Sequence, residues 1–142
     1  MYDVVAIGEL LVDFACRSTD DDGYPVLAAH PGGAPANFLA VLARYGLKTA
    51  LLAKVGNDAF GRLLRRTVER EGIDTAGIVV DDAAFTTLAF VTLDENGERD
   101  FSFARKPGAD MLLRYDELDL SLIDRTRVFH FGSVSMTDEP SR

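Results

Sequence analysis

The chain contains 142 residues, of which 47% are hydrophobic and 27% are charged, and its formal net charge is −8 at pH 7. These proportions are typical of a soluble globular protein with one domain and exclude a disordered chain. An acidic surface offers no counter-charge to a polyanion, so we expect no nucleic acid and no membrane among the partners.

The cysteine content and the N-terminus bear on the compartment. Cys16 is the only cysteine, which excludes an internal disulfide and is typical of a reducing environment. The apolar run at residues 4–7 is much shorter than the core of a signal peptide or a membrane span, and no basic residue precedes it. We therefore expect a cytoplasmic protein.

The first predicted element is a strand at residues 4–7. These residues are apolar without alternation, which is typical of a strand buried on both faces of a parallel sheet. Glu9 and Asp13 follow, so their carboxylates emerge at the carboxyl end of the strand, where open α/β sheets bind ligands. We single out Asp13 as a candidate ligand-binding residue. The structural alternative is a loop carboxylate that faces water.

Residues 14–29 predict two short strands joined by an acidic turn at residues 20–23. His30 follows them, close to the glycines at positions 32 and 33. A lone histidine without an orienting partner is more often structural than catalytic, so the roles of His30 and Glu9 are left open.

A glycine turn, at Gly32 and Gly33, is the feature around which the chain is organised. It predicts the start of a helix, since Pro35 suits the first helical turn and Gly46 suits its end. Glycine backbone lets a ligand approach closely, and Asn37 offers both a donor and an acceptor. This arrangement suits hydroxyl groups or an anion, although two glycines alone are equally typical of a tight turn after a strand.

Two further strand predictions follow along the chain. Residues 49–55 form an apolar run that ends at Gly56, and a helix follows with Asn57 or Asp58 as its cap. Residues 78–80 predict a short strand after that helix.

Residues 86–105 alternate in two segments around Asn96-Gly97, the strongest short-range signal for a β-hairpin. A two-residue turn there pairs Phe90 with Phe103 and places Arg105 at the end of the same face. This aromatic face is either a ligand-facing surface or part of the core.

Residues 106–113 lead back to the core, and residues 128–131 predict a core strand that ends at Gly132. The sequence thus predicts about four core strands and two full helices, which is too few to cover both faces of a sheet. We therefore expect one face to remain uncovered.

Two stretches carry a resemblance to a known family. Gly32-Gly33, Asn37 and the closing Gly46 resemble the first signature of the ribokinase-like (PfkB) carbohydrate kinases. Residues 54–61, Lys-Val-Gly-Asn-Asp-Ala-Phe-Gly, are similar to that family's K-V-G-x-D-x-x-G. Within the family, residues 106–113 and residues 129–135 look most like fructokinases. The resemblance implies an α/β fold: a mostly parallel sheet flanked by helices, plus a small β-sheet lid, truncated here.

By this resemblance, residues 1–142 are the N-terminal part of a sugar kinase. The core segments would be about 1–13, 30–81 and 106–142, and the lid segments about 14–29 and 84–105. The family's second signature, D-T-x-G-A-G-D, supplies the catalytic base and the anion hole, and it does not occur in this sequence. We therefore expect the chain alone to be inactive and assign it no catalytic residue and no metal ligand.

The resemblance also implies a function, the ATP-dependent phosphorylation of a primary hydroxyl of a sugar, most similar to that of fructokinase. ATP and magnesium would be the cofactors of the parent enzyme. The lid would exclude water from the reacting phosphate and would join two copies as a homodimer. The implied sugar-binding residues are Asp13, Gly32, Gly33, Asn37, Phe90, Phe103 and Arg105.

Three alternatives stay open. Arg105 pairs with a carboxylate as readily as it caps a neutral ketose, so 2-keto-3-deoxygluconate is the alternative acceptor. A non-catalytic sugar-binding module is the second alternative. The third is a dinucleotide-binding oxidoreductase, although no G-x-G-x-x-G follows the first strand. The role of Asp110 is also left open.

Overall fold

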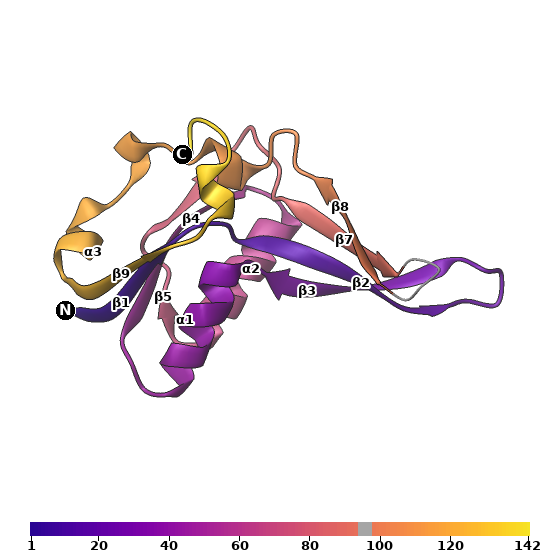
Figure 1. The fold of residues 1–142 in the computed structure, drawn as a ribbon, viewed down its shortest axis with the longest axis horizontal. Helices are drawn as coiled ribbons and strands as arrows, with labels where there is room; N and C mark the ends of the chain where they lie inside the picture. Colours follow the sequence, from indigo (N-terminus) through magenta and orange to yellow (C-terminus); the bar gives the residue numbers. More distant parts are fainter. Residues whose placement is uncertain (94–97) are drawn as a thin grey trace.

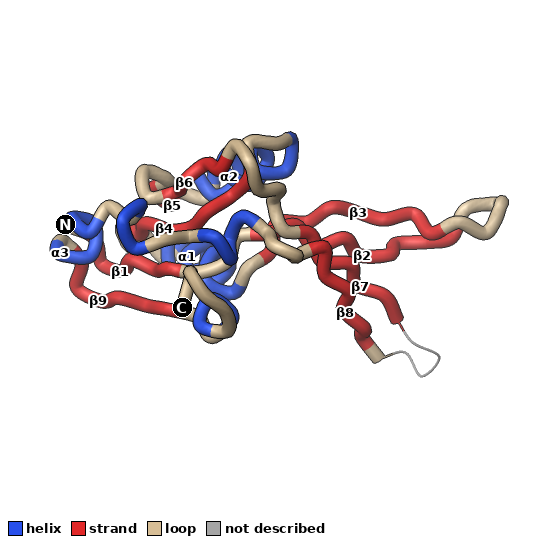
Figure 2. The backbone as a smooth tube through the Cα atoms, turned by 90° about the horizontal axis from the view of Figure 1, so that it is seen from above, coloured by secondary structure: helices blue, strands red, loops and turns tan. Residues whose placement is uncertain are grey.

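The computed structural model describes residues 1–93 and 98–142, which form an α/β core and a second sheet that extends away from it (Figures 1 and 2). The core sheet has the strand order β5-β4-β1-β9, with β6 also paired to β4, and every described pairing in it is parallel. Its strands are β1 (Tyr2–Ile7), β4 (Thr49–Gly56), β5 (Ile73–Asp74), β6 (Ile78–Asp81) and β9 (Thr126–Phe131). The predicted fold class is confirmed.

The two central strands form because their apolar runs have no polar face to present to water. All eight residues of β4 are buried, and Val5 and Ala6 of β1 are fully buried as well. A strand that is apolar on both faces is stable only between two layers of structure, which explains its place in the middle of a parallel sheet.

Helices α1 (Ala34–Arg44) and α2 (Ala59–Arg70) cover one face of the core sheet (Figure 1). Leu39 of α1 and Leu64 of α2 are fully buried in the same cluster as Leu51 of β4. None of the helices in the described ranges is both long and apolar enough to cross a membrane.

Asp58, one of the two predicted caps, begins α2. Its Oδ1 accepts hydrogen bonds from the backbone N–H groups of Phe60 at 2.9 Å and Gly61 at 2.8 Å. Its Oδ2 accepts a third hydrogen bond, at 2.8 Å, from the backbone N–H of Thr86. One carboxylate therefore ties the start of α2 to the segment that enters the second sheet.

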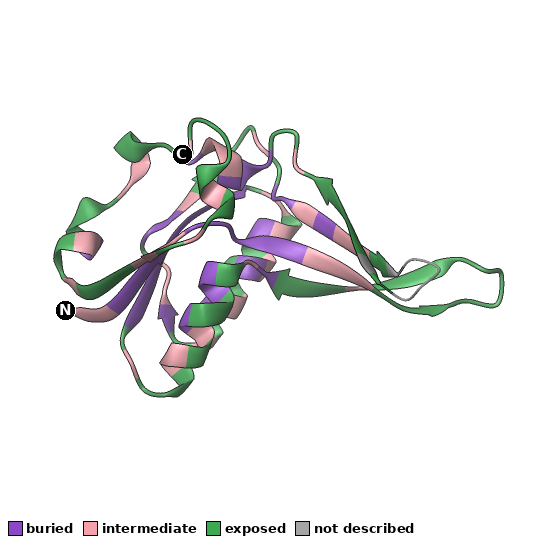
Figure 3. Ribbon diagram, in the orientation of Figure 1, coloured by how far each residue is buried: buried purple, intermediate pink, exposed green. Residues whose placement is uncertain are grey.

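The opposite face of the core sheet has a thinner cover. Val5 and Leu52 pack there against Leu122 of the short helix α3 (Leu120–Asp124). Farther along this face, Phe129 and Phe131 of β9 are 39% and 57% exposed. Most of strand β9 is coloured as exposed in Figure 3. The expectation of an incompletely covered face agrees with this exposure.

The second sheet has the strand order β3-β2-β7-β8. Its strands are β2 (Leu11–Thr19), β3 (Pro25–Gly32), β7 (Leu88–Leu93) and β8 (Arg99–Ala104). β2 and β7 are parallel, and the other two pairings are antiparallel. Since β2 begins only four residues after β1 ends, this sheet grows directly out of the carboxyl edge of the core sheet, the edge at which open α/β sheets generally bind ligands.

The predicted register of the β7-β8 hairpin is wrong by one residue. Phe90 pairs with Ser102, and Phe103 pairs with Ala89, so the two phenylalanines point to opposite faces. The strands end at Leu93 and Arg99, which leaves an odd number of residues between them, whereas a two-residue turn requires an even number. The predicted turn residues, Asn96 and Gly97, lie outside the described residues.

Candidate functional site

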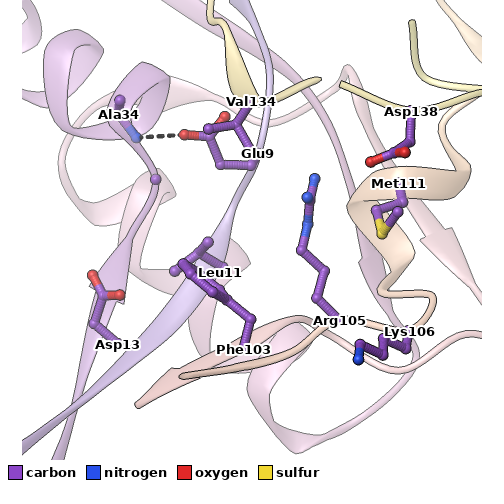
Figure 4. A pocket seen from close by; sticks show the side chains of 11 residues that line it. Glu9, Leu11, Asp13, Ala34, Phe103, Arg105, Lys106, Met111, Val134 and Asp138 are labelled. Atoms are coloured by element: carbon purple, nitrogen blue, oxygen red, sulfur yellow. Dashed lines mark hydrogen bonds between the residues drawn. The ribbon is translucent and has the colours of Figure 1, made fainter. Parts of the chain in front are cut away.

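A cavity of about 450 Å³ lies where the core sheet meets the second sheet (Figure 4). We call it the junction cavity. Five separate segments of the chain contribute to its wall, from the end of β1 to the C-terminal turns. The lining residues are Glu9, Leu11, Asp13, Gly33, Ala34, Phe103, Arg105, Lys106, Met111, Val134 and Asp138. Four of the seven predicted sugar-binding residues are among them: Asp13, Gly33, Phe103 and Arg105.

Asp13 is carried by β2, directly opposite His30 of β3. Burial raises the pKa of the Asp13 carboxyl, and the nearby His30 opposes this shift. Gly32 lies beside the same carboxylate, and a Cβ at this position would collide with it. Gly32 thus makes room for Asp13, and it is not itself part of the cavity wall.

Gly33 precedes α1 with a φ of 112°, a conformation that an L side chain rarely adopts. A Cβ on Gly33 would also collide with the carbonyl oxygen of Glu9. Glycine is therefore required at this turn because α1 packs closely on the backbone of Glu9. Gly33 also lies in the wall of the junction cavity, and the close approach of a ligand to it stays a prediction.

Glu9 supplies the cap that Gly33 lacks. Its Oε1 accepts a hydrogen bond of 3.0 Å from the backbone N–H of Ala34, and the residue is only 5% exposed (Figure 4). Its Oε2 is buried and has no hydrogen-bond partner among the described residues. A carboxylate at a helix N-terminus is stabilised by the helix dipole. The sequence placed Glu9 at the correct strand end but gave no sign of this capping role.

Arg105 enters the cavity from the end of β8 and is held by Asp110 of the 3-10 helix η1 (Ala109–Leu112). Its Nε and Nη2 donate to Asp110 Oδ2 at 2.9 and 2.7 Å. Asp110 Oδ1 accepts a hydrogen bond of 2.5 Å from the buried hydroxyl of Thr87. The carboxylate thus connects the base of the second sheet to the cation in the cavity.

Lys54, at the end of β4, fixes the segment that follows η1. Its ammonium lies 2.9 Å from Asp81 Oδ2 and 2.7 Å from Glu117 Oε1, and it donates to the carbonyl oxygen of Leu112 at 3.1 Å. Hydrogen bonds from Lys54 and from the backbone N–H groups after Asp81 hold the pKa of that carboxyl down to about 2. Lys54 was identified only as part of a family motif, and its observed role is structural.

Asn37 and Phe90 do not line the junction cavity. Asn37 is exposed and borders a separate hollow of about 170 Å³ beside α1, together with Gly32. Phe90 lies on the other face of the second sheet, where its ring stacks on that of Phe14 with the two ring centroids 5.4 Å apart. The prediction that Phe90 and Phe103 cap a ligand from one face is wrong, because it rested on the wrong hairpin register.

The chemistry of the cavity suits a ligand rich in hydroxyl groups. Three carboxylates line it, those of Glu9, Asp13 and Asp138, against the cations Arg105 and Lys106, and Arg105 is already paired. Carboxylates accept hydrogen bonds from hydroxyl groups and repel phosphates. Within residues 1–93 and 98–142, no cluster of three or more His, Cys, Asp or Glu side chains could hold a metal ion. The residues of this cavity therefore do not fit a magnesium nucleotide.

Sequence comparisons place the chain among sugar kinases. Residues 1–141 match the profile of the pfkB family of carbohydrate kinases. Fructokinase-1 of Zea mays is 46% identical over 141 residues, which are 98% of this chain and 44% of the maize protein. Probable fructokinase-3 of Arabidopsis thaliana is 45% identical over 141 residues, covering 98% of this chain and 41% of that protein. The chain thus spans less than half the length of these relatives.

Solved structures agree with the sequence comparisons. A fructokinase from Xylella fastidiosa superposes with a TM-score of 0.92 at 36% identity, over 99% of this chain and 44% of that one. An uncharacterized sugar kinase from Pyrococcus horikoshii, solved in complex with ATP, gives 0.89 at 34% identity, over 98% of this chain and 46% of that one. A putative ribokinase II from E. coli, in complex with ATP and Mg, gives 0.88 at 30% identity, over 99% and 46%. From its sequence match and its fold, the chain belongs to the pfkB family of carbohydrate kinases.

Proposed function

We propose that this chain is the sugar-binding part of a fructokinase-like kinase, which transfers the γ-phosphate of ATP to a primary hydroxyl of fructose. The observation that carries this proposal is the junction cavity, because the carboxylates in its wall can accept hydrogen bonds from hydroxyl groups. The chain that forms this cavity is 46% identical to a fructokinase. The activity of the whole protein and its substrate are part of this proposal.

The chain's own residues bind and orient the sugar. Asp13 accepts hydrogen bonds from neighbouring sugar hydroxyls, and Gly33 allows the ring to lie against the start of α1. Phe103, which is 52% exposed, covers an apolar face of the sugar, while Arg105 donates to an oxygen at the edge. These contacts fix the acceptor hydroxyl in one position, and positioning is a large part of catalysis in phosphoryl transfer.

ATP and Mg²⁺ are assigned to the parent reaction, because two structural relatives were solved in complex with ATP and with ATP and Mg, respectively. Since the cavity does not fit a magnesium nucleotide, we assign their binding, and the catalytic base, to the part of a full-length relative that has no counterpart in these 142 residues. The chain alone is then expected to bind sugar without turnover. A cytoplasmic location remains a prediction.

We also propose that the second sheet acts as a lid and joins two copies of the protein. Apolar side chains are exposed on its strands, among them Val26 at 45% and Phe101 at 48%, and Tyr24, just before β3, is 67% exposed. Burying such side chains against a second copy is favourable, at about 25 cal/mol per Å². A single monomeric species in sedimentation velocity at high protein concentration would contradict this assembly.

Calorimetric titration of the 142-residue chain with fructose tests the proposed function. We expect saturable binding, and Asp13→Asn should weaken it on the order of tenfold or more, because the carboxylate is a better acceptor than the amide. Asp21→Asn, in the exposed turn between β2 and β3, is the matched control and should leave the affinity unchanged.

A coupled assay for ADP release, with ATP, magnesium and fructose, completes this test. We expect no sugar-dependent turnover from the chain alone. Absence of fructose binding would overturn the assignment of the sugar site. Turnover would instead show that the base and the nucleotide site reside within these 142 residues. Sugar binding in a full-length protein that shows no turnover would favour the non-catalytic binding module.

A further inference from the structure

The guanidinium of Arg105 faces the junction cavity, yet most of its charge is already compensated. Two of its nitrogens donate to the same oxygen of Asp110, at 2.9 and 2.7 Å. The Arg105 side chain is 14% exposed and the Asp110 side chain is 1% exposed, so water screens this pair only weakly. The remaining N–H groups of Arg105 can donate to a ligand, but they carry little net attraction for an anion.

Asp110 is fixed in this position from its other side. Its Oδ1 accepts the 2.5 Å hydrogen bond from Thr87, a residue that is 1% exposed. Gly108 leaves room for this hydrogen bond, because a Cβ there would collide with the hydroxyl of Thr87. The carboxylate therefore cannot turn away from Arg105 when a ligand arrives without losing a buried hydrogen bond.

The rest of the cavity wall adds more negative than positive charge. Glu9, Asp13 and Asp138 contribute carboxylates, and Lys106 is the other cation in the wall. A ligand carboxylate placed here would meet the carboxylates of Asp13 and Asp138, and that of Glu9, whose charge is partly offset by the start of α1. Against these stand one exposed lysine and a neutralised arginine. At distances of a few ångströms, each uncompensated charge changes binding by about tenfold.

We propose that Asp110 is a positioning and specificity residue, which orients Arg105 and neutralises it so that the junction cavity selects neutral sugars over sugar acids. This inference rests on the proposed function, because it takes the junction cavity to be the sugar site. It decides between the two acceptors that the sequence leaves open, in favour of fructose and against 2-keto-3-deoxygluconate.

The first test compares these two compounds as ligands of the unaltered 142-residue chain, by titration at 20 mM and 500 mM NaCl. If Arg105 is neutralised, added salt screens the repulsion by the carboxylates, so the affinity for the acid rises or stays constant. A free Arg105 predicts the opposite, a fall in acid affinity with salt. Fructose is uncharged, and its affinity should not change with salt, which makes it the internal control.

The second test uses Asp110→Asn, which keeps the shape of the side chain and removes its charge. We expect the ratio of acid affinity to fructose affinity to rise on the order of tenfold. If the role of Asp110 is purely structural, the substitution should lower the affinity for both ligands alike and leave the ratio unchanged. Asp116→Asn, an exposed carboxylate outside the cavity, is the matched control.

The outcomes separate the two proposals. If fructose binds and acid affinity falls with salt, or if a folded Asp110→Asn chain keeps the original ratio, the selectivity inference is overturned and the sugar site stands. If neither compound binds the unaltered chain, the sugar site itself is overturned, and the selectivity inference falls with it. If the substitution prevents folding, the salt dependence of the unaltered chain decides the question alone.

Discussion

The carboxylate of Glu9 caps helix α1 from a distance of 25 residues along the chain, through a 3.0 Å hydrogen bond to the backbone N–H of Ala34. This contact joins the carboxyl end of β1 to the start of α1, so the strand end and the helix end that form the junction cavity are held together directly. Glu9 also keeps its second oxygen buried without a partner among the described residues.

We expect Glu9→Ala to lower the free energy of unfolding by about 1 kcal/mol, because the N–H of Ala34 loses its acceptor. Urea denaturation measures this change. Glu69→Ala, on the exposed face of α2, is the control and should shift stability by less than about 0.5 kcal/mol. An unchanged midpoint for Glu9→Ala would show that the unpaired Oε2 costs as much as the cap gains.

Lys54→Met should be much more damaging than its size suggests. The Lys54 side chain is 3% exposed, and its ammonium pairs with both Asp81 and Glu117. Its removal leaves Asp81 without this counter-charge and leaves Glu117 with only Arg114, a 56% exposed side chain whose Nη2 lies 3.7 Å away. We expect a loss of about 3 kcal/mol in the free energy of unfolding. Lys48→Met, at an exposed position, is the matched control. Equal stability of the two variants would contradict the structural role of Lys54.

The depressed pKa of Asp81 predicts a specific loss of stability in acid. Its pKa is about 2 in the folded chain against an ordinary 3.8, so the folded state favours the charged form. The resulting stability is fully present above pH 3.8 and is lost as the pH falls toward 2. The stability difference between the wild type and Asp81→Asn should therefore shrink by on the order of 1 kcal/mol across this interval. A constant difference, measured by urea denaturation at several pH values, would contradict the prediction.

The observed hairpin register predicts a division of roles between two phenylalanines. Phe90→Ala removes a ring that stacks on Phe14, so it should cost about 2 kcal/mol of stability and leave sugar affinity unchanged. Phe103→Ala removes a ring that is 52% exposed and lines the cavity, so it should weaken sugar binding and change stability by less than about 0.5 kcal/mol. Loss of sugar affinity in both variants would favour the register with a two-residue turn.

Most of the core could be predicted from local patterns. The run at residues 4–7 is apolar throughout, and residues 49–55 are apolar except for Thr49 and Lys54, so neither run has a polar face and both were predicted as buried strands. The turn at Gly33 was predictable because two adjacent glycines precede Pro35, and its φ of 112° explains why glycine is needed there. The place of Asp13 in the cavity wall was predictable, because this residue follows the carboxyl end of the first strand.

Long-range contacts account for what the sequence did not predict. Nothing near Asp110 indicates that Thr87 and Arg105 will meet it, because that contact depends on how the second sheet docks on the core. Hairpin register is set by where pairing stops, and a favourable turn pair such as Asn96-Gly97 does not fix that point by itself. The one-residue error moved Phe90 to the wrong face.

The position of β9 has a consequence for handling the chain. The described core sheet ends at this strand, so the outer row of its backbone N–H and C=O groups offers hydrogen bonds to any further strand. Phe129 and Phe131, whose ring centroids lie 6.2 Å apart, add an exposed apolar surface beside that edge. A strand edge of this kind is a template for intermolecular β-pairing. In concentrated solution, β9 is therefore where we expect aggregation of this chain to begin.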